Sequence, residues 1–551
     1  MLTAGPSAHL FDRSICDVTD DHDEDFTMAD DHDDDPDDAL GELEDLTEVS
    51  HGAVLSLGGV SAQKVLLFLT NLVLTASLSV SAYGAYALAW RITRILVRFA
   101  PFGSTPTLVR FLPEYRDEPK KQDRVVGLAY LTTLVASVAI ALGVGVFADR
   151  INAATIQHPT FPTILRFLGV LLPLYTFIRL ISFHFRAIER IEYRVLLNRF
   201  AWPVVRLVAV SVAVAMGYAV VGVVGSIVIS GGIVVVLGGW LAATRTRHRP
   251  RLDVSRDELV TFYNYALPNT FKTIGQLLRS RVDVILIGWF LTASAAGIYN
   301  VALFLTSLIA IPLIAFNQLL PPIASRLYAD GKVDRLQAIY STVTRLVFTI
   351  TIALAAIQFV YRTELLALFG SEYTRGTVVL AVFVFGRIVG NGVGATGWLL
   401  LMTDHQYLRL VNSWILAILN VSASYYFVLE FGLVGAALGT AGSMAVVNLV
   451  RLGQLYYLEG LQPFDAKFLK PLGAALGMGA VMMALRPVLS GVVLLVAGTV
   501  AGVLTFLGLL YVLGIERRDR LVASALYDEY RSMVGQLSES VPGTSSGSES
   551  A

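Results

Sequence analysis

Long hydrophobic runs, separated by short polar segments, fill the chain from about residue 53 to residue 514. A run of about 20 apolar residues is long enough to cross a bilayer as an α-helix. Two of the divisions between runs depend on turns predicted at Met216-Gly217 and at Glu430-Phe431-Gly432. With these turns the pattern predicts fourteen spans, near residues 53–77, 83–108, 125–148, 161–184, 197–216, 219–243, 260–290, 295–320, 338–360, 376–401, 409–429, 433–456, 468–487 and 490–514.

The composition supports an all-α, polytopic membrane protein. Of the 551 residues, 55% are hydrophobic and only 15% are charged, and the mean hydropathy is +0.64. A soluble chain carries about 25% charged residues, so most of this chain cannot face water. The first 50 residues differ from the rest, because they hold 18 of the 43 Asp and Glu residues but only one of the 42 Lys and Arg residues. Such an acidic tail is expected to be disordered.

The basic loops alternate with loops that hold few charges, which predicts the orientation. Cytoplasmic loops carry an excess of Lys and Arg. Here these residues gather at 111–124, 186–194, 245–256, 326–335 and 517–520. Both termini are therefore predicted to be cytoplasmic, in a multi-pass protein of the cell membrane. The predicted domains are an acidic cytoplasmic tail (1–50), an N-terminal six-helix bundle (51–245), a cytoplasmic linker (246–258), a C-terminal six-helix bundle (259–458), helices 13 and 14 (459–514) and a cytoplasmic tail (515–551).

A short sequence occurs twice, as SAYGAYALA at 81–89 and as SAAGIYNVA at 294–302, with five of nine positions identical. Six predicted spans separate the two copies, and because six is even the copies point the same way across the membrane. Halves related in this way enclose a midplane site in many transporters and expose it alternately to each side. The repeat therefore predicts two parallel six-helix bundles around one cavity.

Three arginines mark the second predicted span. Arg91, Arg94 and Arg98 follow the spacing i, i+3 and i+7, which places them on one helix face. An arginine that faces lipid at the centre of a helix costs about 2.5–3.5 kcal/mol, and a wet cavity removes most of that cost. Guanidinium groups bind phosphate through two parallel hydrogen bonds, so we expect a substrate-binding anion cavity. The alternatives are an interfacial Arg98 and ion pairs with carboxylates elsewhere.

The predicted span 260–290 holds a second group of candidates. Lys272, Arg279 and Arg281 are expected to bind substrate with the first three arginines. Asp283 lies four residues after Arg279, so the two can form a charge pair on one face. Asp283 could instead bind a coupling proton or sodium ion. The remaining charged or titratable residues inside spans are interpreted singly as helix-end anchors or structural partners, namely Lys64, Arg179, His184, Arg206, Arg345 and Arg387.

Four segments, RVDVILIGWFLTASAAGIYNVAL, LVRFLPEYRDE, LLPPIASRLYADGK and TGWLLLMTDHQYLRLVNSWILAILNVS, resemble those of Wzx-type polysaccharide flippases. These belong to the polysaccharide transporter family of the multidrug/oligosaccharidyl-lipid/polysaccharide exporter superfamily. The resemblance implies fourteen helices, as two bundles of six and two C-terminal helices. It also implies movement of a polyprenyl- or dolichyl-(di)phosphate-linked oligosaccharide, through a cationic cavity that Arg91, Arg94 and Arg98 could supply. The chain departs from many relatives at Ser77-Leu78-Ser79, where they have Arg-Leu-Gly.

We expect a non-enzymatic protein with no cofactor and no metal. The expected partners are the lipid-linked oligosaccharide, membrane lipid, a coupling cation (H⁺ or Na⁺) and glycosyltransferases, with no nucleic acid. The acidic tail and the excess of arginine over lysine resemble those of haloarchaeal proteins, which implies a dolichol-type carrier for surface polysaccharide or glycoprotein synthesis.

Three alternatives stay open. A multidrug or organic-cation antiporter of the same superfamily would favour acidic residues in its cavity. A membrane glycan polymerase or glycosyltransferase would need a large loop or domain for its chemistry, whereas no loop between predicted spans exceeds about 20 residues. A scaffold without transport activity would not require arginines at midmembrane.

Overall fold

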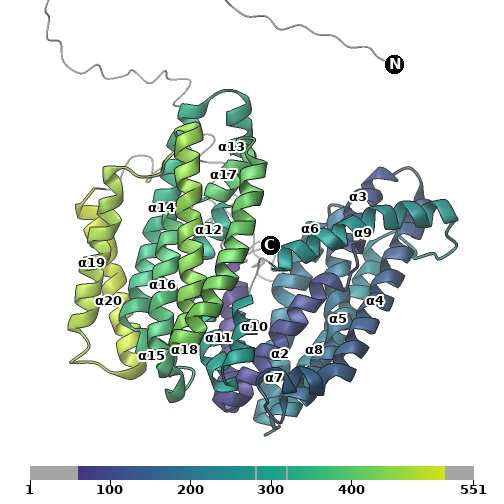
Figure 1. Ribbon diagram of the computed structural model, residues 1–551, viewed down its shortest axis with the longest axis horizontal. Coiled ribbons are helices and arrows are strands. Elements are labelled where there is room, and N and C mark those ends of the chain that lie inside the picture. Colours follow the sequence, from purple (N-terminus) through teal and green to yellow (C-terminus); the bar gives the residue numbers. More distant parts are fainter. Residues whose placement is uncertain (1–59, 279–281, 318–319, 515–551) are drawn as a thin grey trace, which may run out of the picture. The chain divides into compact units, whose positions relative to one another are not determined.

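The computed structural model describes residues 60–278, 282–317 and 320–514, and every element in these ranges is a helix (Figure 1). Nine of the described helices are long and apolar enough to cross a membrane, and the helix Ala293–Ile309 is apolar but shorter. The prediction of an all-α, multi-pass membrane protein is confirmed. The count of fourteen spans and the domain boundaries stay predictions, and the tails 1–50 and 515–551 lie outside the described residues.

The N-terminal half begins with the helix Val60–Ser77, which carries no label in Figure 1. Its other elements before the linker are α2 (Val80–Phe99), α3 (Ser104–Glu114), α4 (Pro119–Ala153), α5 (Phe161–Ala187), α6 (Ile191–Val195), the π-helix η1 (Leu196–Ala201), α7 (Trp202–Ala215) and α8 (Val220–Arg245).

The C-terminal half follows the linker. Its elements are α9 (Arg256–Leu278), α10 (Val282–Phe290), α11 (Ala293–Ile309), α12 (Ile311–Phe316), α13 (Leu320–Ala329), α14 (Val333–Val360), α15 (Arg362–Ala367), the 3₁₀-helix η2 (Ser371–Gly376), α16 (Thr377–Gly392), α17 (Thr396–Met402), α18 (Gln406–Glu459), the 3₁₀-helix η3 (Ala466–Phe468), α19 (Leu469–Ala484) and α20 (Gly491–Val512).

Glycines end the helices at both predicted turns. Gly217 has a φ of +75° between α7 and α8. Gly432 has a φ of 54° and a ψ of −126° inside the 54 residues of α18, so two helices meet there. Because glycine adopts positive φ without a Cβ clash, both predicted divisions are confirmed.

The single span predicted over 83–108 is wrong, because α2 ends at Phe99 and α3 begins at Ser104. Gly103, between them, has a φ of +76°, and a Cβ on it would lie 2.0 Å from the carbonyl oxygen of Ala266 in α9. The turn therefore needs glycine for its backbone conformation and for its close contact with α9. The span predicted over 260–290 likewise consists of two described helices, α9 and α10.

The two copies of the repeated sequence form the starts of α2 and α11, and these two helix starts pack against each other. The side chains of Ser79 and Thr292, again 213 residues apart, cap these helices by accepting hydrogen bonds from Ala82 N and Ala295 N. A Cβ added to Gly84 would lie only 1.7 Å from the carbonyl oxygen of Ala293. The repeat thus supplies equal helix starts and a backbone contact between the halves.

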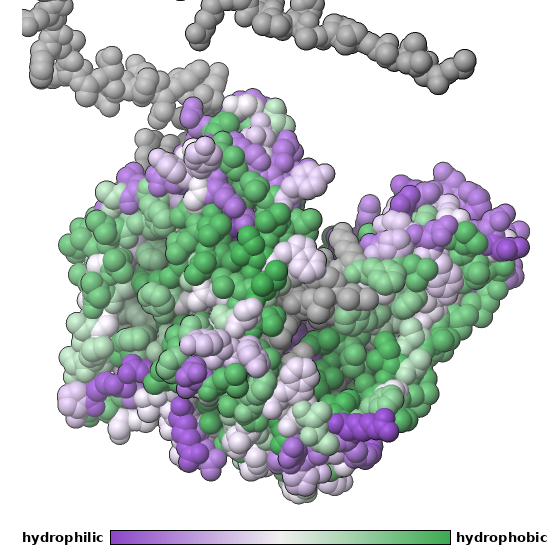
Figure 2. Space-filling view, viewed as in Figure 1, coloured by the Kyte–Doolittle hydropathy of each residue, from purple (hydrophilic) through white to green (hydrophobic). Residues whose placement is uncertain are grey.

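The last two helices pack on the C-terminal half. Helices α19 and α20 bury Met478, Met482 and Phe506 against α14 and Tyr361, whose hydroxyl donates to Met482 O at 3.1 Å (Figure 1). Hydrophobic side chains cover the middle of the face drawn in Figure 2, and hydrophilic ones gather at its two ends. This distribution is the one expected of a protein embedded in a bilayer.

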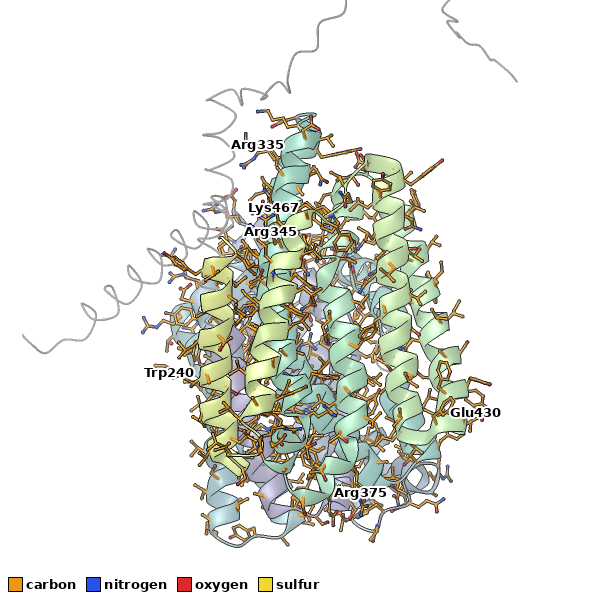
Figure 3. The ribbon with its side chains drawn as sticks, turned by 90° about the vertical axis from the view of Figure 1, so that its left-hand side faces the viewer. Trp240, Arg335, Arg345, Arg375, Glu430 and Lys467 are labelled. Atoms are coloured by element: carbon orange, nitrogen blue, oxygen red, sulfur yellow. The ribbon has the colours of Figure 1, made fainter. Side chains whose placement is uncertain are left out.

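Charged residues of successive loops lie at opposite ends of the C-terminal helices. Figure 3 places Arg335, Arg345 and Lys467 toward one end and Arg375 and Glu430 toward the other. The basic loop that precedes α14 and the loop that precedes α16 therefore face opposite sides, as the alternation of the loops predicted.

Candidate functional site

A cavity of about 280 Å³ lies where the helix Val60–Ser77, α2, α7 and α11 meet. Its walls come from both halves of the chain. Five cationic residues line it, namely Lys64, Arg91, Arg94, Arg98 and Arg206. We call it the central cavity.

Helix α2 contributes the three arginines that the spacing placed on one face. Arg91, Arg94 and Arg98 all line the central cavity, and the side chains of Arg94 and Arg98 are exposed within it. The chain is locally helical here because Ser79 caps the N-terminus and small or apolar residues follow, such as Ala85 and Leu88, which are buried. The structure therefore brings the first three predicted site residues together.

Arg206 comes from the middle of α7 and is only 4% exposed. It donates a hydrogen bond to the hydroxyl of Tyr86, and its guanidinium carbon lies 4.5 Å from the centroid of a Trp90 ring. Trp90 in turn stacks on Trp202, with 6.4 Å between ring centroids and 7° between planes. Aromatic rings stabilise a guanidinium over their faces, so this cluster holds Arg206 at the cavity wall. Its Nε has no hydrogen-bond partner among the described residues.

Polar residues of the helix Val60–Ser77 and of α11 also line the central cavity, namely Lys64, Asn71, Asn300 and Ser307. The hydroxyl of Tyr83 donates to Asn71 Oδ1 at 2.9 Å and accepts from Asn300 Nδ2 at 2.9 Å. Lys64 Nζ donates to Ser307 Oγ at 2.8 Å. Each bond joins two different helices, and two of the three join the N-terminal half to the C-terminal half. Residues that line the cavity therefore also hold the two halves together.

The electrostatics of the central cavity favour an anion. Among the described residues that line it, five are cationic and none is Asp or Glu. Charges in a cavity with low-dielectric walls act more strongly than charges in water. The described chain holds no group of three or more His, Cys, Asp and Glu residues that could bind a metal ion. The arrangement can bind phosphate, carboxylate or another anion that accepts several hydrogen bonds.

The second group of predicted residues is only partly covered by the structure. Lys272 belongs to α9 and Asp283 to α10, but the side chains of these two residues are outside the part of the chain that the structure describes. Arg279 and Arg281 lie outside the described residues altogether. Their roles in substrate binding and ion coupling stay predictions.

Two other residues make the structural contacts predicted for them. His184 is buried. Its Nδ1 shares a hydrogen bond of 3.0 Å with the Tyr130 hydroxyl, and its Nε2 shares one of 2.9 Å with Nδ1 of His248 in the linker. Arg345 forms an ion pair with Asp465 at 3.1 Å. Lys64 and Arg206 differ, because their positions in the sequence predicted anchors or structural partners whereas both line the central cavity. The visible signal was that Arg206 is the one charged residue in the apolar stretch Trp202–Ala215.

Comparisons with known proteins place the chain in a family. The profile of the family described as "Polysaccharide biosynthesis protein" matches residues 49–328, and the MatE profile matches residues 268–393. A probable low-salt glycan biosynthesis flippase, Agl15 of Haloferax volcanii, is 28% identical over 218 residues. That match covers 39% of this chain and 45% of the relative, so it spans less than half of the relative's length.

Two solved structures share the fold. The lipid II flippase MurJ, in an inward closed conformation, has a TM-score of 0.66 at 13% identity, over 87% of this chain and all of that one. An inward-facing multidrug resistance MATE family transporter has a TM-score of 0.57 at 16% identity, over 72% of this chain and 96% of that one. Since the first profile covers more than half of the 551 residues, the chain belongs to the polysaccharide biosynthesis protein family, within the multidrug/oligosaccharidyl-lipid/polysaccharide exporter superfamily that its sequence resembles.

Proposed function

We propose that the protein is a flippase that moves a polyprenyl- or dolichyl-(di)phosphate-linked oligosaccharide across the cytoplasmic membrane by alternating access. Both termini and the basic loops lie on the cytoplasmic side in this proposal. The observation that carries it is the central cavity, with five cationic residues and no acidic one among its described lining. The likeness to a probable glycan flippase over part of the chain is consistent with the same substrate class.

The phosphate or diphosphate is the part of such a substrate that the central cavity suits best. Arginine donates two parallel hydrogen bonds to a phosphate, in a planar geometry that lysine lacks. Arg94 and Arg98 reach into the space, while Arg206 is held against Trp90. The cavity of about 280 Å³ lies below the usual range of about 300–1,000 Å³ for ligand sites. It therefore suits the charged linkage, and the sugars and the lipid extend beyond it.

Alternating access requires the halves to separate on one side. At Gly84 the backbones of α2 and α11 lie so close that an added Cβ would be 1.7 Å from Ala293 O. In the proposed cycle this contact closes the side opposite the basic loops, and it opens to release the glycan. Asp283 is proposed to bind the coupling proton or sodium ion, near Arg279 and Arg281 in the sequence.

An organic-cation antiporter is the second candidate, and the MatE profile match over residues 268–393 favours it. The sign of the charge in the central cavity argues against it, because a cationic drug would be repelled by Arg91, Arg94 and Arg98. A carboxylate pocket is the expected feature of a cation exporter.

Transport by purified protein in vesicles decides between the two. Wild-type protein is reconstituted with dolichyl diphosphate-linked disaccharide, and the glycan on the outer leaflet is detected by its accessibility to an added glycosidase. In protein-free vesicles about half of the glycan is accessible to the glycosidase, and we expect the wild-type protein to raise this fraction. No rise, combined with efflux of ethidium from the same vesicles under a proton or sodium gradient, would replace the flippase by the antiporter.

A further inference from the structure

A second hollow, of about 570 Å³, adjoins the central cavity at Arg98. Four arginines line it, namely Arg98, Arg110, Arg179 and Arg186. We call this hollow the arginine vestibule. It lies among the end of α2, the helices α3 and α5, and α9, which contributes Tyr265 and Thr273.

Three helices bring these arginines to one place. Arg98 lies in the last turn of α2, and Arg110 lies in α3 beyond the turn at Gly103. Arg179 and Arg186 are seven residues apart in α5, so they share one face of that helix. The turn between α2 and α3 is what directs Arg98 and Arg110 toward the same space.

The arginines that line the vestibule make it cationic. Arg110 is 3.5 Å from Glu114, but both side chains are about half exposed, at 53% and 48%, and such pairs stabilise little. The Arg110 guanidinium also lies 4.6 Å from the Tyr265 ring centroid. Among the described residues that line the vestibule, none is Asp or Glu. This exposed pair offsets little of the charge that Arg110, Arg179 and Arg186 bring to the vestibule.

Like charges repel within this group. Arg179 is partly buried and lies within electrostatic range of Arg94 and Arg98. Interfacial snorkelling accounts for Arg186, which is exposed, but not for Arg179. An anion among these side chains would relieve the repulsion and accept charge-assisted hydrogen bonds from several of them.

We propose that the arginine vestibule is a second anion-binding site, which takes the phosphate or diphosphate of a polyprenyl-linked substrate before Arg98 passes it to the central cavity. The inference rests on the proposed function. The vestibule adjoins the basic loops that follow Glu114 and Arg186, where a substrate made in the cytoplasm arrives. Because Arg98 lines both spaces, it can keep one contact while the anion moves from the other three arginines to Arg94 and Arg91.

Binding of geranylgeranyl diphosphate to the full-length protein in detergent tests this site. The vestibule variant is Arg179→Gln combined with Arg186→Gln, and its matched control is Arg166→Gln, an exposed arginine of the same helix that pairs with Asp149. We expect the vestibule variant to bind about tenfold more weakly. The affinity of the control is expected to stay within about twofold of that of wild type. Geranylgeraniol, which lacks phosphate, is expected to bind tightly to none of the three proteins.

Other arms separate the ways in which the proposal could fail. If the vestibule variant binds like the control while Arg94→Gln is weakened, the vestibule is wrong and the central cavity keeps its role. If wild type does not bind the probe, the vestibule is also wrong, and the flipping assay judges the proposed function independently. Displacement of the probe by phosphatidylglycerol, from wild type as readily as by pyrophosphate, would make the vestibule a general headgroup site and overturn the substrate assignment.

Folding is controlled within the same experiment. Arg186→Gln alone changes an exposed side chain, and we expect it to weaken binding without lowering the thermal unfolding temperature. Arg179→Lys keeps the charge and is expected to recover part of the affinity that Arg179→Gln loses. If Arg179→Lys restores the full affinity and all variants unfold at the same temperature, the site is still supported, because binding then depends on the charge at this position.

Discussion

Replacing Gly84 by valine tests whether the contact between α2 and α11 closes one side of the protein. A Cβ on Gly84 would lie 1.7 Å from Ala293 O, 2.7 Å from Ala293 C and 2.9 Å from Gly297 N. All three are backbone atoms, so no side-chain rotation can relieve the clash. Valine adds two further methyl groups to this Cβ, and the two helices must move apart.

The size of the effect follows from these distances. Real Cβ contacts do not come closer than 3.0 Å, so the 1.7 Å approach requires a displacement of roughly 1.3 Å or more. Overpacking of this kind costs about 1–3 kcal/mol. A cost that applies only when the helices touch shifts the equilibrium toward the separated state by about 5- to 150-fold.

Distance measurement between spin labels provides the assay. Labels at Ser81 and Ser294, the first positions of the repeated sequence, report the separation of α2 and α11 once Cys16 is changed to serine. Double electron–electron resonance is expected to show a short distance in wild type. The Gly84→Val protein is expected to show a longer one and to flip substrate more slowly, because it closes rarely.

Gly232→Val is the matched control, since Gly232 also lies inside a helix but nothing stands within 4 Å of its Cβ position. It is expected to keep the wild-type distances and flipping rate. If Gly84→Val has the same distances and rate as this control, the contact between α2 and α11 is not the closure.

Three further predictions concern other parts of the molecule. Tyr86→Phe removes the hydroxyl that accepts from the buried Arg206; we expect a loss of about 1–3 kcal/mol in unfolding free energy, measured by chemical denaturation and contradicted by unchanged stability. Burial lowers the pKa of His248 below the ordinary value of 6.5. The folded state then binds fewer protons than the unfolded state, so docking of the linker is expected to be complete above about pH 6.5 and to weaken as the pH falls below it. Hydrogen exchange of the linker amides measures this, and His248→Gln should remove the dependence. Asp283→Asn is expected to abolish acceleration of flipping by a proton or sodium gradient, while flipping without a gradient continues; an unchanged response would exclude Asp283 as the coupling residue.

Much of the fold follows from the spacing of apolar residues, because a helix in a bilayer must satisfy its own backbone hydrogen bonds over the whole thickness. The turns at Gly217 and Gly432 were predictable since glycine interrupts a run that is otherwise continuous. The break between α2 and α3 was not predicted, although Pro101 and Gly103 lie within it. The run stays apolar through Phe102, so hydropathy alone carries no signal there.

The site was predictable only where its residues share one helix. Arg91, Arg94 and Arg98 lie on one face because of their spacing, and the structure places them in one cavity. Arg206 could not be assigned in this way, since its partner Tyr86 is 120 residues away in the sequence. Lys64 likewise meets Ser307 at a separation of 243 residues. Such pairs depend on the packing of the two halves, which a single periodic pattern does not describe.

Flipping by a protein that lacks the three arginines of α2 shows whether the central cavity binds the substrate. Arg91, Arg94 and Arg98 are changed together to glutamine and compared with wild type and with Arg166→Gln, in vesicles that contain dolichyl diphosphate-linked disaccharide. Each lost contact between an arginine and a phosphate should weaken binding by about tenfold. We expect the triple variant to lose flipping at normal expression and unfolding temperature, whereas Arg166→Gln retains it. Flipping at the wild-type rate by the triple variant would contradict the role of the central cavity in binding the substrate.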